Sequence, residues 1–114
     1  MGRIIGIDLG TTNSLAAVWE NGRPVLIPNA LGSYLTPSVV SIENTEEGKT
    51  VYVGETAKQR LITHPESTVS VFKRFMGSEK EYRLGSHRFR PEDLSALILR
   101  SLKEDAEDYL KEPV

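Results

Sequence analysis

In residues 4–9, IIGIDL, the apolar residues Ile5, Ile7 and Leu9 recur at every second position, and this period of two predicts a β-strand. The next run, residues 15–19, is apolar at odd and even positions alike, which predicts a central strand covered on both faces. The pair Asn21-Gly22 then favours a two-residue hairpin turn that sends residues 24–27 back antiparallel. The chain is therefore expected to open with a three-stranded meander.

Shorter apolar segments follow in the middle of the chain. Residues 38–42 and 51–53 are expected to form partner strands, with the polar stretch 43–50 as a turn-like connection. Residues 55–63 have a helical composition, and this helix should end there because the residue before Pro65 is biased away from the helical region. A pair of strands followed by a short helix is the expected arrangement.

Spacings of three and four between apolar residues predict two more helices. Residues 67–77 contain such a pattern and end in a glycine suited to a helix terminus. Residues 82–84 and 87–89 flank a Gly-Ser turn and read as a second hairpin. From Pro91, followed by two acidic residues, a helix is expected to run to about residue 112. One stripe of this helix is apolar and consists of Leu94, Leu97, Ile98, Leu102, Ala106, Tyr109 and Leu110.

This order of elements favours an α/β domain with an antiparallel or mixed sheet and flanking helices. The chain has 114 residues, of which 39% are hydrophobic and 26% charged, as in one ordinary soluble domain with a modest core. Its net charge of -2, with both signs interspersed, gives no basic surface for nucleic acid or for a membrane. The absence of cysteine excludes disulfides and thiol catalysis, and the first apolar run is too short for a signal peptide. We therefore expect a cytoplasmic protein.

The segment that follows the first strand contains the candidate chemistry. Asp8 closes an otherwise apolar strand, Gly10 permits a tight backbone turn, and Thr11, Thr12 and Asn13 add polar side chains and backbone amides. Successive amides in a tight turn form a concavity that suits phosphate oxygens, and a nearby carboxylate can hold hydrated Mg²⁺. An ordinary hairpin turn uses the same residue types, so spacing alone leaves both interpretations open. Neither GxxxxGK[ST] nor GxGxxG occurs in the chain.

The string GIDLGTTNS at residues 6–14 resembles the first phosphate loop of the actin-like ATPase superfamily. With the later segments, the chain is similar to the start of a DnaK-type heat-shock chaperone of the seventy-kilodalton class. The resemblance implies the first lobe of an actin-like, ribonuclease-H-type ATPase domain. The segments that share the family's order and spacing are PN at 28–29, LTPSVVS at 35–41, VGETAK at 53–58, FKRFMG at 72–77 and AEDYLKEPV at 106–114.

The resemblance also implies roles for individual residues. Asp8 would act on Mg²⁺ through water, and residues 10–13 would wrap the phosphates of ATP or ADP. Lys73 would be the catalytic lysine that faces the attacking water, although from the residues alone a surface lysine is the default interpretation. Residues 36–38, TPS, are expected only to set a turn and the entry to a strand.

Two departures from the family pattern affect the expected architecture. Only thirteen residues separate Gly77 from Pro91, where mainstream members have a longer strand-bearing insertion, so the upper subdomain is expected to be truncated as in the short HscC-like branch. The chain also stops where the family continues into its second phosphate loop, adenosine site and peptide-binding domain. We therefore expect residues 1–114 to be an amino-terminal lobe fragment without ATPase activity, whose apolar stripe from Leu94 to Leu110 stays exposed and promotes self-association.

The function implied by the resemblance is that of a Mg-ATP-binding part of an ATP-driven chaperone that assists protein folding. Its implied partners are ATP, unfolded peptide clients and a J-domain cochaperone, with a nucleotide exchange factor as a further candidate. Two alternatives from the same superfamily are a bacterial actin-like filament subunit, which shares IGIDLGT, PSVV and VGxxAK, and a sugar kinase. The segments FKRFMG and TNS favour the chaperone, and no clear set of sugar-contacting residues is found.

Overall fold

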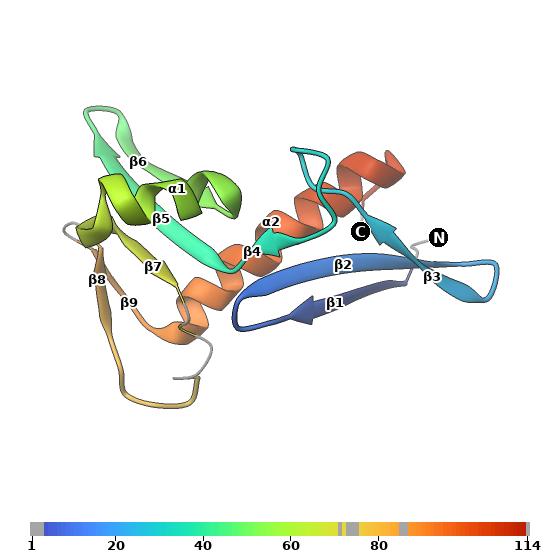
Figure 1. The fold of residues 1–114 in the computed structure, drawn as a ribbon, viewed down its shortest axis with the longest axis horizontal. Coiled ribbons are helices and arrows are strands. Elements are labelled where there is room, and N and C mark those ends of the chain that lie inside the picture. Colours follow the sequence, from blue (N-terminus) through green and yellow to red (C-terminus); the bar gives the residue numbers. More distant parts are fainter. Residues whose placement is uncertain (1–3, 71, 73–75, 85–86, 114) are drawn as a thin grey trace.

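The computed structural model describes residues 4–70, 72, 76–84 and 87–113, and in these ranges the strands form antiparallel sheets flanked by two α-helices (Figure 1). The first sheet has the strand order β1-β2-β3, with β1 at Ile5–Leu9, β2 at Asn13–Glu20 and β3 at Arg23–Ile27. A fourth, two-residue strand, β4 (Thr36–Pro37), pairs with the start of β2. The predicted meander is therefore confirmed, with one added strand.

The turn between β2 and β3 forms where the sequence predicts it. Asn21 has φ 51° and Gly22 has φ 79°, so both lie in the left-handed region that a type I′ hairpin turn requires. The two strands then pair from Glu20 with Arg23 as far as Ala16 with Ile27. The local turn chemistry sets this register.

The second sheet has the strand order β6-β5-β7, with β5 at Val39–Thr45, β6 at Gly48–Val53 and β7 at Thr68–Ser70. The expectation that residues 43–50 form a turn is wrong, because the ladder continues through Glu43 opposite Thr50 and reaches Thr45 opposite Gly48. These polar positions lie at the exposed end of the hairpin, where a strand needs no apolar side chains. Cross-strand pairing therefore overrides the polar composition.

Helix α1 spans Glu55–Thr63, as predicted, and a single 3-10 turn, η1 (Pro65–Ser67), follows it. The helix predicted from residue 67 is wrong at its start, because Thr68–Ser70 forms β7 and pairs with β5. Two of these three residues, Thr68 and Val69, are β-branched and fit a strand, and β5 supplies the ladder partner. The rest of that prediction falls partly on residues 71 and 73–75, which lie outside the described residues.

A second hairpin and a long helix complete the fold. The hairpin consists of β8 (Tyr82–Leu84) and β9 (His87–Phe89), and α2 spans Pro91–Leu110, all close to the predicted bounds. The Asp93 carboxylate accepts the N–H of Arg90 at 2.8 Å, which caps the first turn of α2. Neither helix in the described part of the chain is long and apolar enough to cross a membrane.

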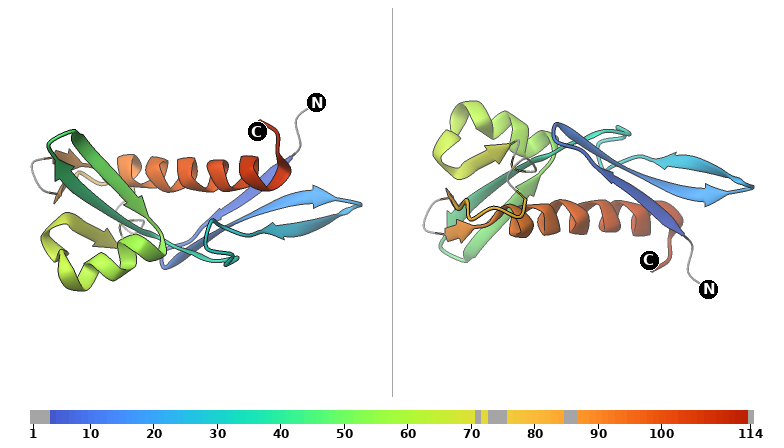
Figure 2. Two further views of the ribbon diagram at one scale, coloured as in Figure 1. Left: turned by 90° about the horizontal axis from the view of Figure 1, so that it is seen from above. Right: turned by 90° about the horizontal axis from the view of Figure 1, so that it is seen from below.

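Helix α2 runs beside both sheets and supplies much of the hydrophobic core (Figure 2). Its apolar stripe is largely buried within this chain, so the expectation that the stripe stays exposed is wrong, except at Tyr109, which is 44% exposed. The inner face of the first sheet covers it, since α2 packs against β1, β2 and β3. The other face of β2 is open, with Trp19 56% exposed, so the expected covering on both faces is also wrong. The core residues on α2 are Leu94, Ile98, Leu102 and Ala106.

Candidate functional site

The turn between β1 and β2 gathers most of the predicted site residues. Asp8 is the penultimate residue of β1, its side chain is exposed, and it lies opposite Leu15 in the register. The turn residues follow directly, with Gly10 and Thr11 partly buried and Thr12 exposed. Asn13, also exposed, begins β2. The structure therefore brings the carboxylate and the polar turn together at one end of the hairpin, near the junction of the two sheets (Figure 1).

Gly10 is required by the tightness of this turn. A Cβ atom added at Gly10 would overlap the backbone carbonyl oxygen of Asn13. Gly6, four positions earlier on the outer face of β1, has no atom within 4 Å of the same added group. The sequence interpretation of Gly10 as a residue that no other can replace is consistent with this close approach.

Ser38 supports the turn from behind. Its backbone N–H donates to the carbonyl of Thr12 at 2.9 Å, and its hydroxyl donates to the carbonyl of Gly10 at 2.8 Å. The Ser38 hydroxyl also lies 2.8 Å from that of Ser14, and both side chains are buried. The sequence predicts only a turn and a strand entry at residues 36–38, so the contact of Ser38 with the candidate site is apparent only in the structure. Two serines 24 positions apart give no local signal of their pairing.

Asn29 fixes the chain that leads into β4. Its side-chain amide donates to the Thr36 hydroxyl at 3.1 Å, and its side-chain oxygen accepts the N–H groups of Leu31 and Ser33, each at 3.0 Å. Gly54 also packs closely against this strand, because a Cβ added at Gly54 would lie 3.0 Å from the Thr36 methyl group. These contacts hold β4 in place and therefore hold Ser38 behind the turn.

Lys73, the predicted catalytic residue, lies outside the described residues, so its role stays a prediction. Its neighbour Phe72 is only 2% exposed and belongs to the hydrophobic core. Among the described residues, no group of three or more His, Cys, Asp or Glu side chains could hold a metal ion. A single exposed carboxylate, Asp8, fits Mg²⁺ nonetheless, because this ion keeps several waters and is usually bound through one or two carboxylates together with substrate phosphates.

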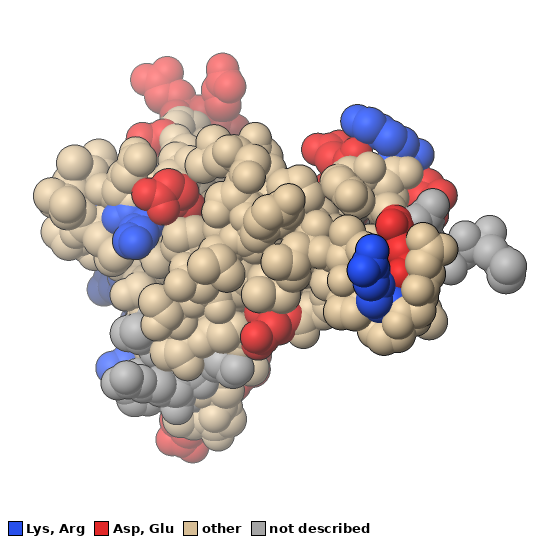
Figure 3. All heavy atoms as spheres, turned by 45° about the vertical axis from the view of Figure 1, so that its right-hand side comes forward, with Lys and Arg blue, Asp and Glu red and all other residues tan. Residues whose placement is uncertain are grey.

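The turn lies on the surface, and a larger hollow among the described residues lies elsewhere. A cavity of about 550 Å³ is lined by Ile4, Trp19, Glu20 and Asn21, at the opposite end of the same hairpin. The face drawn in Figure 3 is mostly uncharged, and its acidic and basic side chains are scattered over it.

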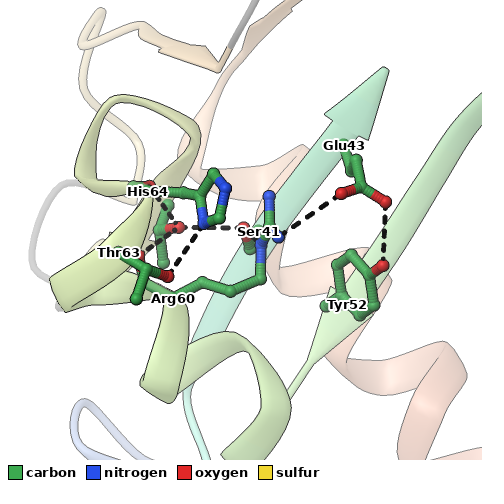
Figure 4. A network of polar contacts seen from close by, with 7 residues as sticks. Ser41, Glu43, Tyr52, Arg60, Thr63 and His64 are labelled. Atoms are coloured by element: carbon green, nitrogen blue, oxygen red, sulfur yellow. Dashed lines mark hydrogen bonds and ion pairs between the residues drawn. The ribbon is translucent and has the colours of Figure 1, made fainter. Parts of the chain in front are cut away.

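A second polar network, which we call the Arg60 network, lies in the other half of the molecule (Figure 4). From α1, the Arg60 Nε donates to the Ser41 hydroxyl at 2.6 Å, and its guanidinium lies 3.7 Å from the Glu43 carboxylate. The Tyr52 hydroxyl donates to the same carboxylate at 3.0 Å, and this hydrogen bond raises the pKa of Tyr52. Ser41 also bonds Thr68 at 2.8 Å, so the network ties α1 to β5, β6 and β7.

Among the described residues, Asp105 on α2 is the titratable group whose pKa is most affected by its surroundings. Burial, with the charges of Glu104 and Asp108 as smaller causes, raises the pKa of Asp105 to about 6. It contributes to a cavity of about 170 Å³ between α2 and the segment that begins at Pro28. Asp105 is not among the residues that form the turn between β1 and β2.

One comparison with known proteins bears on this architecture. The family model described as Hsp70 protein matches residues 4–84, well over half of the chain. The matched range includes the β1–β2 turn, Ser38 behind that turn, and the Arg60 network. The small α/β fold with antiparallel sheets is that of a truncated actin-like ATPase lobe. The chain therefore belongs to the Hsp70 family.

Proposed function

We propose that the chain binds Mg-ATP or Mg-ADP through the turn between β1 and β2, as part of an ATP-driven chaperone. The observation that supports this most directly is the arrangement of Ser38 behind the turn, which holds two backbone carbonyls on one side. The backbone amides of such a turn are then directed to the opposite side, where phosphate oxygens can accept from them. Membership of the Hsp70 family supports the choice of nucleotide over another anion.

Each turn residue has a distinct task in this proposal. Gly10 permits the tight turn, and the hydroxyls of Thr11 and Thr12 and the amide of Asn13 add hydrogen-bond donors around the phosphates. Donors arranged in advance lose little freedom when the ligand binds, which favours both binding and any later stabilisation of charge. Mg²⁺, when bound, would neutralise phosphate charge. Asp8 would hold the hydrated ion from the end of β1.

The finer parts of the proposal depend on the sequence resemblance. Lys73 would orient the attacking water and stabilise charge on the transferred phosphoryl group. A DnaK-like, HscC-like assignment is supported by the short segment between Gly77 and Pro91. Peptide clients, a J-domain cochaperone and a cytoplasmic location belong to the same proposal, with a nucleotide exchange factor as a further candidate.

The experiment is a titration of the isotopically labelled chain with ATP, with and without Mg²⁺, followed by amide NMR shifts. We expect the shifts to concentrate at residues 10–13 and to saturate at a lower ATP concentration with Mg²⁺ than without it. Asp8→Asn should remove the advantage of Mg²⁺ while leaving binding without Mg²⁺ intact. Glu46→Gln, at the exposed tip of the β5–β6 hairpin, is the matched control and should behave as the parent.

Two outcomes would count against the proposal. Amides of residues 10–13 that do not respond to ATP at any soluble concentration would remove the turn as a phosphate site. In a chain with the complete ATPase domain, Lys73→Ala should slow single-turnover hydrolysis about a hundred- to a thousandfold and leave ATP affinity almost unchanged. Hydrolysis at the parental rate would show that Lys73 is only a surface lysine.

A further inference from the structure

Ser38 makes three hydrogen bonds around the turn between β1 and β2, and their directions can be assigned. The Ser38 hydroxyl has one proton, and the geometry gives it to the Gly10 carbonyl at 2.8 Å. The contact of 2.8 Å between the two serine hydroxyls must then have Ser14 as its donor and the Ser38 oxygen as its acceptor. In the described part of the chain no buried side-chain oxygen or nitrogen lacks a partner, so this small buried chain of hydroxyls is fully satisfied.

These bonds fix the orientation of two peptide groups in the turn. In a planar trans peptide the N–H points opposite to the C=O of the same group. The Gly10 carbonyl faces the Ser38 hydroxyl and the Thr12 carbonyl faces the Ser38 amide, at 2.8 and 2.9 Å. The N–H groups of Thr11 and Asn13 are therefore directed away from Ser38, on the side of the turn where a phosphate would bind.

We infer that Ser38 is a positioning residue for the phosphate-binding turn, which sets the direction of the Thr11 and Asn13 amides without touching the ligand. This inference depends on the proposed function. Ser38 is also the residue at which the chain passes from β4 in the first sheet to β5 in the second. It therefore fixes the turn relative to both sheets, and a shift of β5 against β2 is transmitted to those amides.

Ser41 offers a matched control for a merely structural role. It lies three residues later, on β5, its side chain is fully buried, and its hydroxyl bonds Thr68 at 2.8 Å and accepts from Arg60 at 2.6 Å. None of these partners belongs to the turn. Replacement of either serine by alanine removes one buried hydroxyl, but only Ser38→Ala frees the Gly10 carbonyl.

The test compares Ser38→Ala with Ser41→Ala in the whole 114-residue chain. Amide NMR titrations use two probes: Mg-ATP, and Mg-tripolyphosphate, which has no base or sugar. Ser38→Ala should raise the Kd for both probes about three- to tenfold, since one hydrogen bond is lost. Before any ligand is added, the Thr11 amide should shift more than the Asn13 amide, because the Ser38 backbone still holds the Thr12 carbonyl. Ser41→Ala should lower thermal stability and leave both Kd values unchanged.

The outcomes separate this inference from the proposed function. If the parent binds both probes and Ser38→Ala binds them equally well, the positioning role is wrong and the proposed function stands. If the parent binds neither probe, both are wrong. Should Ser38→Ala fail to fold, Ser14→Ala removes only the donor to the Ser38 oxygen and should raise Kd in the same direction by a smaller factor. A parental Kd for that variant overturns the inference.

Discussion

The two polar networks described above stabilise different parts of the structure. The one behind the turn, formed by Ser14 and Ser38, is uncharged and buried, and it bonds backbone carbonyls. The Arg60 network is charged and partly exposed, and in it the Arg60 side chain on α1 contacts Ser41 and Glu43 of the second sheet. The first fixes the conformation of a loop, whereas the second fixes the packing of a helix.

This difference indicates where function and stability are separable. A neutral hydroxyl pair can hold backbone groups close together without placing a charge beside a site for anions. A guanidinium in the same place would itself attract the phosphate and would need a large cavity. We therefore expect changes in the Arg60 network to alter stability alone, and changes around the turn to alter ligand binding as well.

The largest expected effect is that of Gly10→Ala. The added Cβ would overlap the Asn13 carbonyl, so the turn must change its conformation, at a cost of about 3 kcal/mol in the free energy of unfolding. Urea unfolding measures this cost, and Mg-ATP binding should be lost together with it. Gly6→Ala is the control, because nothing lies within 4 Å of its added group and alanine suits a strand better than glycine. Equal stability of the two variants would contradict the requirement for glycine in the turn.

The next effect in size is that of Arg60→Ala. Its side chain is mostly buried, and it stacks on the Tyr52 ring at 4.9 Å in addition to its bonds to Ser41 and Glu43. Its loss should cost about 2 kcal/mol, seen as a lower Tm, while the amide shifts of the turn stay unchanged. Arg88→Ala should cost less than about 0.5 kcal/mol, because its contact with Glu81, at 4.0 Å, is exposed on both sides. A change in the amide shifts of the turn in Arg60→Ala would contradict the expectation that the two networks act independently.

The smallest effect, from Asp105→Asn, depends on pH. In the folded chain Asp105 keeps its proton up to a pKa of about 6, compared with 3.8 for the unperturbed group. Between these values the folded state binds more protons, so stability falls as the pH rises from about 4 to about 6. Asp105→Asn removes this penalty and should stabilise the chain by about 1 kcal/mol at pH 7, a figure reduced because the group is partly exposed.

Thermal unfolding at pH 7 and at pH 4 checks this prediction, since the gain should be small at pH 4. Asp108→Asn, which removes a neighbouring charge but no buried carboxylate, should give a smaller gain at pH 7. Equal gains at both pH values would contradict the raised pKa of Asp105.

Local chemistry made much of the fold predictable. Asn21-Gly22 adopts the backbone angles of its turn, Pro91 begins α2, and the bounds of α1 agree with the prediction. The failures have one cause, which is the presence of a distant partner. Residues 68–70 become a strand because β5 lies beside them, and the polar residues near Glu43 extend a ladder for the same reason.

The residues of the candidate site likewise divide into those that local sequence predicts and those that depend on a distant partner. Asp8 and the turn residues are adjacent in sequence, so a pattern of nine letters was enough to select them. Ser38 is 28 positions from Gly10, and its role follows only from the pairing of β4 with β2. The error for the apolar stripe of α2 has the opposite direction: the stripe is expected to be exposed but is buried, because the sheet that covers it is in this same chain.

The open face of the first sheet gives the molecule a built-in optical reporter. Trp19 is the only tryptophan in the sequence, it is 56% exposed, and it lies at the end of the β1–β2 hairpin opposite the turn. Its fluorescence therefore reports unfolding of the first sheet and does not respond to changes in the Arg60 network. Far-UV circular dichroism follows α1 and α2 instead. If the melting curves measured by the two signals do not coincide, the two sheets unfold in separate steps.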